Sequence, residues 1–372
     1  MPRAAMVLCV SSILMAGGCK PGGSAAPPAP EPGVLVQAIG CTPESTSRDC
    51  TQSNGNGIYI SRTEPAGRYG LASSDWWTFY LMGFINRIDN QVIARGWHEV
   101  NGAIVVVDSQ VVGAIYQGTT VTLRSLGVRK TYLGARILDA QGQEMELSGD
   151  SLKELVLLVT DSEPGHLPIT YELRFSEALR MDGALGTFGY RMDYRPTTLQ
   201  GAPRISYCQR PVAGGTAYED MATVFHQGAH WSPTDATRTD GDELISVSCE
   251  SGAIATCMRW GYAPWRTASR AQGEPESLVP YHQACLHLKR AAYCGGGTSY
   301  TKNDTRIIVV DPFEPPIQNR SVDRIEAAWS PQQGLCLTEQ RRKDIPLNGC
   351  ALPACDAQTM SGWYLISGLP SP

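Results

Sequence analysis

The sequence predicts a mainly β protein with a few short helices (an α+β fold). It is expected to combine an N-terminal domain of β-sandwich or open-barrel type with a disulfide-rich C-terminal domain. Three observations carry this prediction. Short runs of β-forming residues end at glycines, one segment of the second half has helical periodicity, and most of the twelve cysteines lie in that second half.

The first nineteen residues predict a secretory signal that ends in a lipid-attachment site. Arg3 is followed by an apolar run from Ala4 to Ala16, which is too short to span a bilayer as a permanent helix. Two glycines then precede Cys19. This order resembles the lipobox of bacterial lipoproteins, in which the cysteine thiol receives a diacylglycerol, although Ala16 stands where leucine is usual. We therefore expect residues 1–19 to be a lipoprotein signal peptide and Cys19 to be the lipidation site.

A spacer follows the expected lipidation site. Residues 20–33 read KPGGSAAPPAPEPG, a composition that cannot bury apolar surface and behaves as a semi-extended tether. Acyl chains of the palmitate type on Cys19 carry enough methylenes for lasting attachment to a bilayer. Lys20 follows Cys19, which by resemblance to lipoprotein sorting rules favours the outer membrane. The protein is therefore expected to be exported and anchored to a bacterial membrane, at the cell surface or on the periplasmic face.

Residues 34–198 are expected to form the β-rich domain. Ile104–Val107 is a compact apolar run that suits a buried strand, whereas Val121–Arg124 and Ile169–Phe175 alternate as half-buried strands do. Several short strands with glycines between them favour a sandwich or an open barrel. The proline and glycine cluster from Pro196 to Pro203 then predicts a joint with the second domain.

Residues 204–372 are expected to form a domain held together by disulfides. Apart from Cys9 and Cys19, ten cysteines remain, and an even number in an exported protein predicts up to five bridges. These disulfide candidates are Cys41, Cys50, Cys208, Cys249, Cys257, Cys285, Cys294, Cys336, Cys350 and Cys355. The pair 41 and 50 and the pair 350 and 355 are each close enough in sequence to close a local loop.

The segment Tyr281–Ala292 has the apolar spacing of an amphipathic helix that ends at the following glycines. On a helix that continues to Cys294, Cys285 would lie about 13 Å from it along the axis. A disulfide needs its Cα atoms within about 7 Å. These two cysteines are therefore expected to bridge elsewhere and not to each other. His282 beside Cys285 suggests a Cys–His nucleophile, but bridging of the cysteine makes that interpretation the weaker one.

The second half also contains six motif blocks in a recognisable order. They are Ile245–Trp265 (ISVSCESGAIATCMRWGYAPW), His282–Cys285, Arg290–Gly297, Ile307–Asp311, Glu326–Pro331 and Cys336. From Ile205 to Leu337 the chain resembles the ADYC-domain family of bacterial, often lipid-anchored exported proteins. In the family's Ala-Asp-Tyr-Cys tetrad, Ala291, Tyr293 and Cys294 match, but Ala292 replaces the aspartate. The resemblance implies an exported ADYC-like domain over residues 204–372, and it implies no activity.

The sequence gives no catalytic constellation and no metal site, and no cofactor is expected. A net charge of −5 and a pI near 5.7 argue against nucleic acid as a partner. The basic run Arg341–Lys343 is expected to be a solvated loop. His226 and His230 have a spacing that suits zinc on a helix, but a third ligand is missing. The acidic run Asp240–Glu243 is expected to be a solvated turn, since it lacks the full spacing of a calcium loop.

The favoured interpretation is a membrane-anchored exported lipoprotein that serves as a non-catalytic binding or structural module at the cell surface. Its partners would be the membrane, through Cys19, and an unidentified extracellular or periplasmic ligand. The alternative is a cell-envelope hydrolase acting on glycan or peptide, suggested by the aromatic segment Asp75–Ile85 and by the acidic and histidine residues within 226–243. The aromatic segment equally suits core packing. A third possibility is an inhibitor or toxin-like module, because disulfide-dense domains often have such roles.

Overall fold

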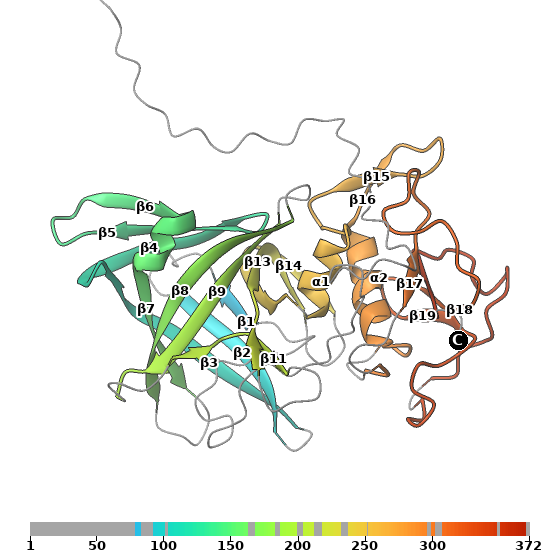
Figure 1. The fold of residues 1–372 in the computed structure, drawn as a ribbon, viewed down its shortest axis with the longest axis horizontal. Helices are drawn as coiled ribbons and strands as arrows, with labels where there is room; N and C mark the ends of the chain where they lie inside the picture. Colours follow the sequence, from blue (N-terminus) through green and yellow to red (C-terminus); the bar gives the residue numbers. More distant parts are fainter. Residues whose placement is uncertain are drawn as a thin grey trace, which may run out of the picture. The chain divides into compact units, whose positions relative to one another are not determined.

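The computed structural model describes residues 79–82, 92–100, 103–162, 168–182, 187–198, 204–211, 218–231, 237–250, 252–295, 299–301, 307–347 and 350–369. The chain divides into two compact units, 1–36 and 37–372, and every described residue belongs to the second. The expected signal peptide with Cys19, the tether, Cys41, Cys50 and most of Asp75–Ile85 lie outside the described residues. The described part is mainly β with three helices, which confirms the predicted fold class (Figure 1).

One large antiparallel sheet of twelve strands dominates the described part of the chain. Its strand order is β2-β1-β14-β13-β9-β8-β7-β3-β4-β5-β6, with β10 paired to β9. Because β3 also pairs with β2, the sheet curls back on itself as a half-barrel (Figure 1). The strands are β1 (Phe79–Met82), β2 (Val92–Val100), β3 (Ala103–Tyr116), β4 (Thr119–Arg129), β5 (Tyr132–Leu138), β6 (Glu144–Ser148), β7 (Leu155–Ser162), β8 (Ile169–Asp182), β9 (Thr187–Pro196), β10 (Ile205–Ser206), β13 (Thr223–Trp231) and β14 (Arg238–Cys249).

The C-terminal part combines two helices with a smaller antiparallel sheet of order β17-β20-β18-β19, drawn in orange to red in Figure 1. The remaining elements are η1 (Gly149–Glu154), β11 (Gln209–Pro211), β12 (Tyr218–Asp220), α1 (Ala253–Arg259), β15 (Thr267–Ser269), β16 (Pro275–Ser277), α2 (Val279–Arg290), β17 (Ile308–Val310), β18 (Ile325–Trp329), β19 (Gly334–Leu337) and β20 (Leu365–Gly368). None of the helices in the described part has the length and apolar character that a membrane span requires.

The strands form where the sequence alternates between apolar and polar residues. The predicted run Ile169–Phe175 opens β8, and its residues Tyr171, Leu173 and Phe175 are buried while Arg174 is exposed. Val121–Arg124 lies within β4, so both alternating runs are confirmed as strands. The continuous apolar run Ile104–Val107 lies within β3 and is also confirmed as a strand. Alternation succeeds here because successive side chains of a strand point to opposite faces of the sheet.

The large sheet crosses the joint that the sequence predicts at Pro196–Pro203. β9 ends at Pro196 and pairs with β10, while β13 and β14 continue the sheet as far as β1. Strands from both predicted domains therefore share one hydrogen-bonded sheet. A proline and glycine cluster interrupts regular pairing, because proline lacks the N–H donor and glycine weakens strands. Such an interruption is compatible with one sheet that continues on both sides of it.

Strand β13 lies between two hydrophobic cores. Phe225 belongs to the core of the curled sheet, together with Val247 of β14. Val224 and Trp231 belong to a second core, built with α1, α2 and the smaller sheet. A β-bulge at Gly228 shifts the pairing of β13 with β14. The unpaired residues of the bulge lie on β14, and on β13 Gly228 adopts a left-handed conformation with φ of 97°. The alternation of β13 changes across Gly228, since Val224 before it and Trp231 after it reach the same core from even and odd positions.

Helix α2 is shorter than its periodicity predicts. The apolar spacing extends to Ala292, whereas the helix ends at Arg290. Ala291 follows in the left-handed conformation with φ of 51°, and the Ala292 N–H donates to the His287 carbonyl over 2.9 Å. A left-handed residue ends a helix because its backbone turns out of the helical path while it closes the last hydrogen bonds. Cys294 therefore lies beyond the helix.

Candidate functional site

Four disulfides connect segments of the described chain between Cys208 and Cys355. Cys208–Cys249 joins the end of β14 to the segment before β11, and Cys257–Cys285 joins α1 to α2. Cys294–Cys350 holds the segment after α2, and Cys336–Cys355 joins β19 to the C-terminal loop. The described part thus pairs eight of the candidate cysteines. Each bridge typically contributes about 2–4 kcal/mol to stability.

The pairing agrees with one sequence argument and departs from another. Cys285 and Cys294 do not pair with each other, as expected, although the reason differs because Cys294 is not on the helix. The local loop considered between Cys350 and Cys355 does not form, since each of these cysteines bridges to an earlier segment. Sequence proximity is a weak guide because the tertiary fold decides which Cβ atoms approach each other.

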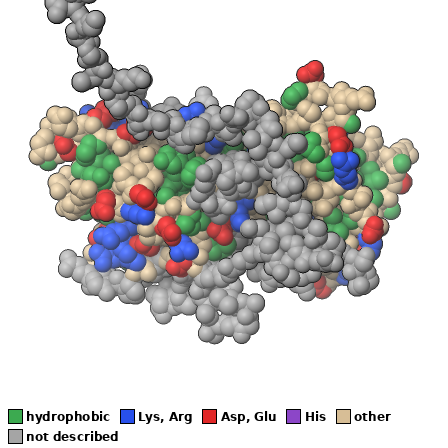
Figure 2. All heavy atoms as spheres, turned by 45° about the horizontal axis from the view of Figure 1, so that its top comes forward, with side chains coloured by type: hydrophobic (Ala, Val, Ile, Leu, Met, Phe, Trp, Pro, Cys, Tyr) green, Lys and Arg blue, Asp and Glu red, His purple; other side chains and the backbone are tan. Residues whose placement is uncertain are grey.

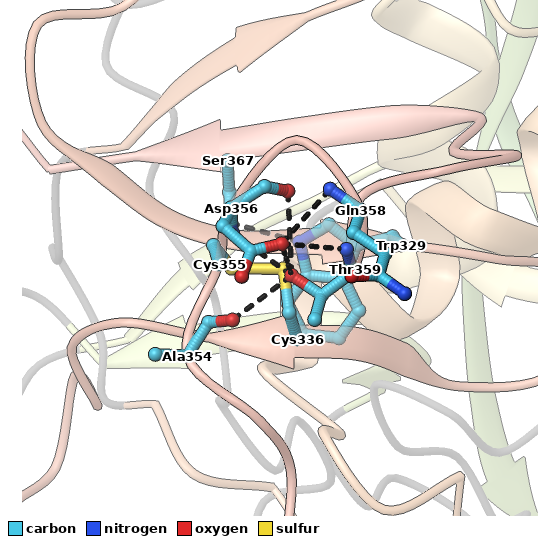
Figure 3. Close-up of a disulfide and its surroundings, with 8 residues drawn as sticks. All are labelled: Trp329, Cys336, Ala354, Cys355, Asp356, Gln358, Thr359 and Ser367. Atoms are coloured by element: carbon cyan, nitrogen blue, oxygen red, sulfur yellow. Dashed lines mark hydrogen bonds between the residues drawn. A yellow bond between two sulfur atoms is a disulfide. The ribbon is translucent and has the colours of Figure 1, made fainter.

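The C-terminal loop beside Cys355 is organised by its own side chains (Figure 3). Asp356 Oδ1 accepts hydrogen bonds from the Gln358 and Thr359 N–H groups at 2.9 and 2.8 Å. The Thr359 hydroxyl donates to the Ala354 carbonyl at 2.9 Å. The hydrogen bond from the Thr359 N–H is the main reason that the pKa of Asp356 lies below its ordinary value. The acidic side chain therefore serves the loop conformation.

Ala291, Ala292 and Tyr293 of the tetrad segment are buried in the second core, and Cys294 packs against it partly buried. Ala291 supplies the left-handed turn, and Cys294 supplies a disulfide. The ring of Tyr293 stacks on Trp329 with centroids 5.4 Å apart and planes 20° from parallel. Ala292, which stands where the family tetrad has aspartate, is 1% exposed, so no carboxylate enters the core at this position. Each matched residue of the tetrad has a structural role.

A buried ion pair lies next to the tetrad. Arg341 Nε lies 2.6 Å from Glu326 Oε1, and its Nη2 donates to Glu326 Oε2 at 2.9 Å. The Tyr293 hydroxyl donates to Glu326 Oε1 at 2.7 Å, and Arg341 Nη1 donates to the Lys289 carbonyl at 3.1 Å. Burial, followed by the charge of Glu326, raises the pKa of Tyr293. The prediction that Arg341 belongs to a solvated loop is wrong, because its side chain has no exposed surface.

A second buried carboxylate, Asp311, organises the turn after β17. It accepts hydrogen bonds from the Tyr262 hydroxyl at 3.0 Å and from three N–H groups, those of Phe313 (3.2 Å), Ile317 (3.1 Å) and Gln318 (2.8 Å). Burial raises the pKa of Asp311, and these hydrogen bonds oppose the rise. Carboxylates with raised pKa values often mark active sites. Here both oxygens are occupied by contacts from the protein itself, which favours a structural role.

Two histidines pack among tryptophans in the second core. His226 is 6% exposed, and its ring centroid lies 5.8 Å from that of Trp231 and 5.9 Å from that of Trp265. Neither ring nitrogen of His226 has a partner with hydrogen-bond geometry among the described residues. His282 Nε2 lies 3.1 Å from the Ile254 carbonyl oxygen. Burial is the main reason that the pKa of each histidine falls to about 3. Both rings are therefore neutral near pH 7.

The described residues contain no group of three or more His, Cys, Asp or Glu that is suited to a metal ion. His226 lies on strand β13, so the helical spacing considered with His230 does not apply. The acidic run Asp240–Glu243 lies within β14, and the expectation of a turn there is wrong. Its first carboxylate is exposed and pairs with Arg238 at 2.7 Å. Alternation could have revealed this strand, since apolar Ile245, Val247 and Cys249 alternate with Ser246 and Ser248.

The fold and the tetrad segment define a mainly β protein in which disulfides cross-link the C-terminal half of the chain. A family model of the ADYC domain matches residues 149–343, slightly more than half of the chain, and this protein belongs to that family. The match begins at Gly149 in η1, ahead of the Ile205 from which the resemblance was traced. It therefore includes β7, β8 and β9 and spans the predicted joint. No curated protein and no solved structure matches the chain.

Proposed function

We propose that this protein is an exported lipoprotein, anchored through Cys19, that acts as a non-catalytic binding or structural module at the cell surface. The observation that carries the proposal is the set of four disulfides in the described part of the chain. Disulfides persist in oxidising compartments and are rare in the cytosol, which supports export. The signal-like residues 1–19 and the tether 20–33 support a lipid anchor.

The non-catalytic part of the proposal is supported by what the buried polar groups do. Glu326 is paired with Arg341, and Asp311 is surrounded by donors from its own turn. The hydroxyl group of the tetrad residue Tyr293 donates a hydrogen bond to Glu326. Glu326, Asp311 and Tyr293 belong to the motif blocks that carry the family resemblance, and each of them holds neighbouring segments together. A rigid module that presents its outer surface to a partner is the role that this arrangement favours.

Lipid anchoring is tested by expressing the full chain and its Cys19→Ser variant in a Gram-negative host with an alkyne fatty acid in the medium. The full chain is expected to carry the label and to enter the membrane fraction, and Cys19→Ser is expected to lose both. Cys9→Ser is the matched control, because it removes the other cysteine of the same segment. Equal labelling of the full chain and Cys19→Ser would contradict the anchor, as would retention of the full chain in the cytosol.

The hydrolase alternative has weaker support in the described residues. It rested partly on His226, which is buried between Trp231 and Trp265 and not presented to solvent. Purified protein is therefore expected to leave peptidoglycan fragments and peptide libraries intact. If it cleaves either substrate, and if His230→Ala or Asp242→Ala abolishes cleavage in a variant that still unfolds cooperatively, the protein is an enzyme and the proposal is wrong.

A further inference from the structure

The outer face of the curled sheet carries a depression of about 320 Å³. Leu155 and Leu157 of β7 belong to the core cluster, whereas Val156 between them lines the depression. Successive residues of a strand point to opposite faces, so the depression lies on the side of the sheet away from the core. Its volume falls at the lower end of the range for small-molecule sites.

Three adjacent strands build the floor and one wall of this depression. Ile115 of β3 pairs with Val156 of β7, and Val156 pairs with Arg174 of β8. Two aliphatic side chains and a guanidinium thus follow one another across the sheet. Val156 is 7% exposed and Arg174 is exposed. Ile115 is half-buried, so the row offers a small apolar surface, mostly that of Ile115, which ends at a cation.

Most other charged groups around the depression already have partners. Glu172 accepts from Arg195 Nε at 2.9 Å and from Arg204 Nη2 at 2.7 Å. Lys153 lies 2.8 Å from Asp150 at the end formed by η1. These cations are compensated by neighbouring carboxylates. Figure 2 shows basic and acidic side chains close together on the face of the molecule that it presents.

Arg174 differs from these cations. Among the described carboxylates it has no partner within ion-pair distance, and its charge acts on Glu172 only as one of several that lower the pKa of that carboxyl. A guanidinium presents a planar fork of donors that matches both oxygens of a carboxylate. The lining also includes the carboxylates of Glu154 and Glu172, which would repel a multiply charged phosphate. A singly charged anion is therefore the better match.

We propose that this depression binds a small organic carboxylate, with Arg174 holding the carboxylate and Ile115 and Val156 contacting an aliphatic or aromatic body. The proposal deepens the proposed function, since it rests on the protein being a binding module and names the ligand class. The apolar floor is what selects an organic acid over a simple inorganic anion. No bond is made or broken in this step, so the site captures its ligand without changing it.

The test uses the oxidised full chain with Cys19→Ser, labelled for methyl NMR and titrated with 4-methylpentanoate. The Ile115 and Val156 methyl signals are expected to shift and saturate, with a Kd on the order of 1 mM for so small a ligand. The uncharged 4-methylpentanamide and the short acetate are each expected to bind at least about tenfold more weakly, because one lacks the charge and the other the apolar body. Equal binding of the amide would overturn the proposal.

Two arginine variants complete the test. Arg174→Gln is expected to weaken the binding of 4-methylpentanoate at least about tenfold. Arg191→Gln is the matched control, because Arg191 lies on the same sheet, pairs with Glu177 at 3.4 Å and does not line the depression. Unchanged affinity in Arg174→Gln, or the absence of saturable shifts, overturns the site. Neither result affects the acyl-labelling experiment, so failure of this site and failure of the lipoprotein proposal are distinguishable.

Discussion

Removing either Glu326 or Arg341 alone from their buried ion pair is expected to lower the free energy of unfolding strongly. Neither side chain has exposed surface, and Arg341 approaches both carboxylate oxygens of Glu326. In Arg341→Met the carboxylate keeps the hydrogen bond from Tyr293 but loses its cation. Removing one partner of a buried pair costs about 3–5 kcal/mol, because the other charge stays in a medium that solvates it poorly. Urea titration of the oxidised protein, followed by tryptophan fluorescence, measures this loss.

The double variant Glu326→Leu with Arg341→Met removes both charges, and comparing it with the two single variants measures the coupling between them. Two apolar side chains leave no unpaired charge. The fall in the free energy of unfolding is therefore expected to be at least about 2 kcal/mol smaller in the double variant than the sum of the falls in the two single variants. Part of the loss should remain, because Tyr293 and the Lys289 carbonyl each lose a hydrogen-bond partner. Lys343→Met is the control, since Lys343 pairs with Glu339 on the surface. A loss in Arg341→Met no larger than in Lys343→Met, or strict additivity, would refute the reasoning.

Replacing both Cys257 and Cys285 by alanine is expected to lower the free energy of unfolding by about 3.6 kcal/mol, because the bridge closes a sequence separation of 28 residues; a loss below about 1 kcal/mol in urea titrations would argue against this account. Stability is expected to fall from about pH 6.5 toward pH 3, partly because burial lowers the pKa of His226 to about 3 while the unfolded chain takes up the proton at its ordinary 6.5. His226→Phe should therefore reduce the slope of the free energy of unfolding against pH, between about pH 4 and 6, by up to about 1.4 kcal/mol per pH unit. An unchanged slope would contradict this role of His226. Gly368→Ala is expected to lower the free energy of unfolding by about 1–3 kcal/mol, because the new Cβ would lie 2.7 Å from a main-chain carbonyl oxygen. Gly127→Ala serves as the control in thermal unfolding, because its new Cβ meets no atom within 4 Å.

The candidate site shows where sequence reasoning succeeds and where it stops. The motif blocks around Tyr293 and Glu326 identified the family, which the match over residues 149–343 bears out. The sequence did not reveal the role of those residues, because Tyr293 and Glu326 are 33 positions apart in the chain. Arg341, which forms the ion pair with Glu326, belongs to a basic run whose sequence predicts a solvated loop. Nothing local distinguishes Arg341 from Arg342 beside it. Only the path of the chain places one in the core.

The depression on the outer sheet face is a similar case. Ile115, Val156 and Arg174 come from three strands, and none of them stands in a motif that the sequence distinguishes. A pattern search finds ligands that lie close together along the chain, such as histidines at helical spacing. It does not find a row that exists only once strands have paired in register. The helical spacing of His226 and His230 was misleading for the same reason, since β13 is a strand.

The sequence by itself determined the mainly β class, the strand at Ile169–Phe175, the helix near Tyr281 and the family, because each depends on residues close together in the chain or on their order along it. The tertiary structure alone decided that one sheet crosses Pro196–Pro203, that Cys350 bridges to Cys294, and that Arg341 is buried. These outcomes depend on contacts between distant segments. Burial and hydrogen bonding over the whole core select such contacts, and a local pattern does not encode their free energies.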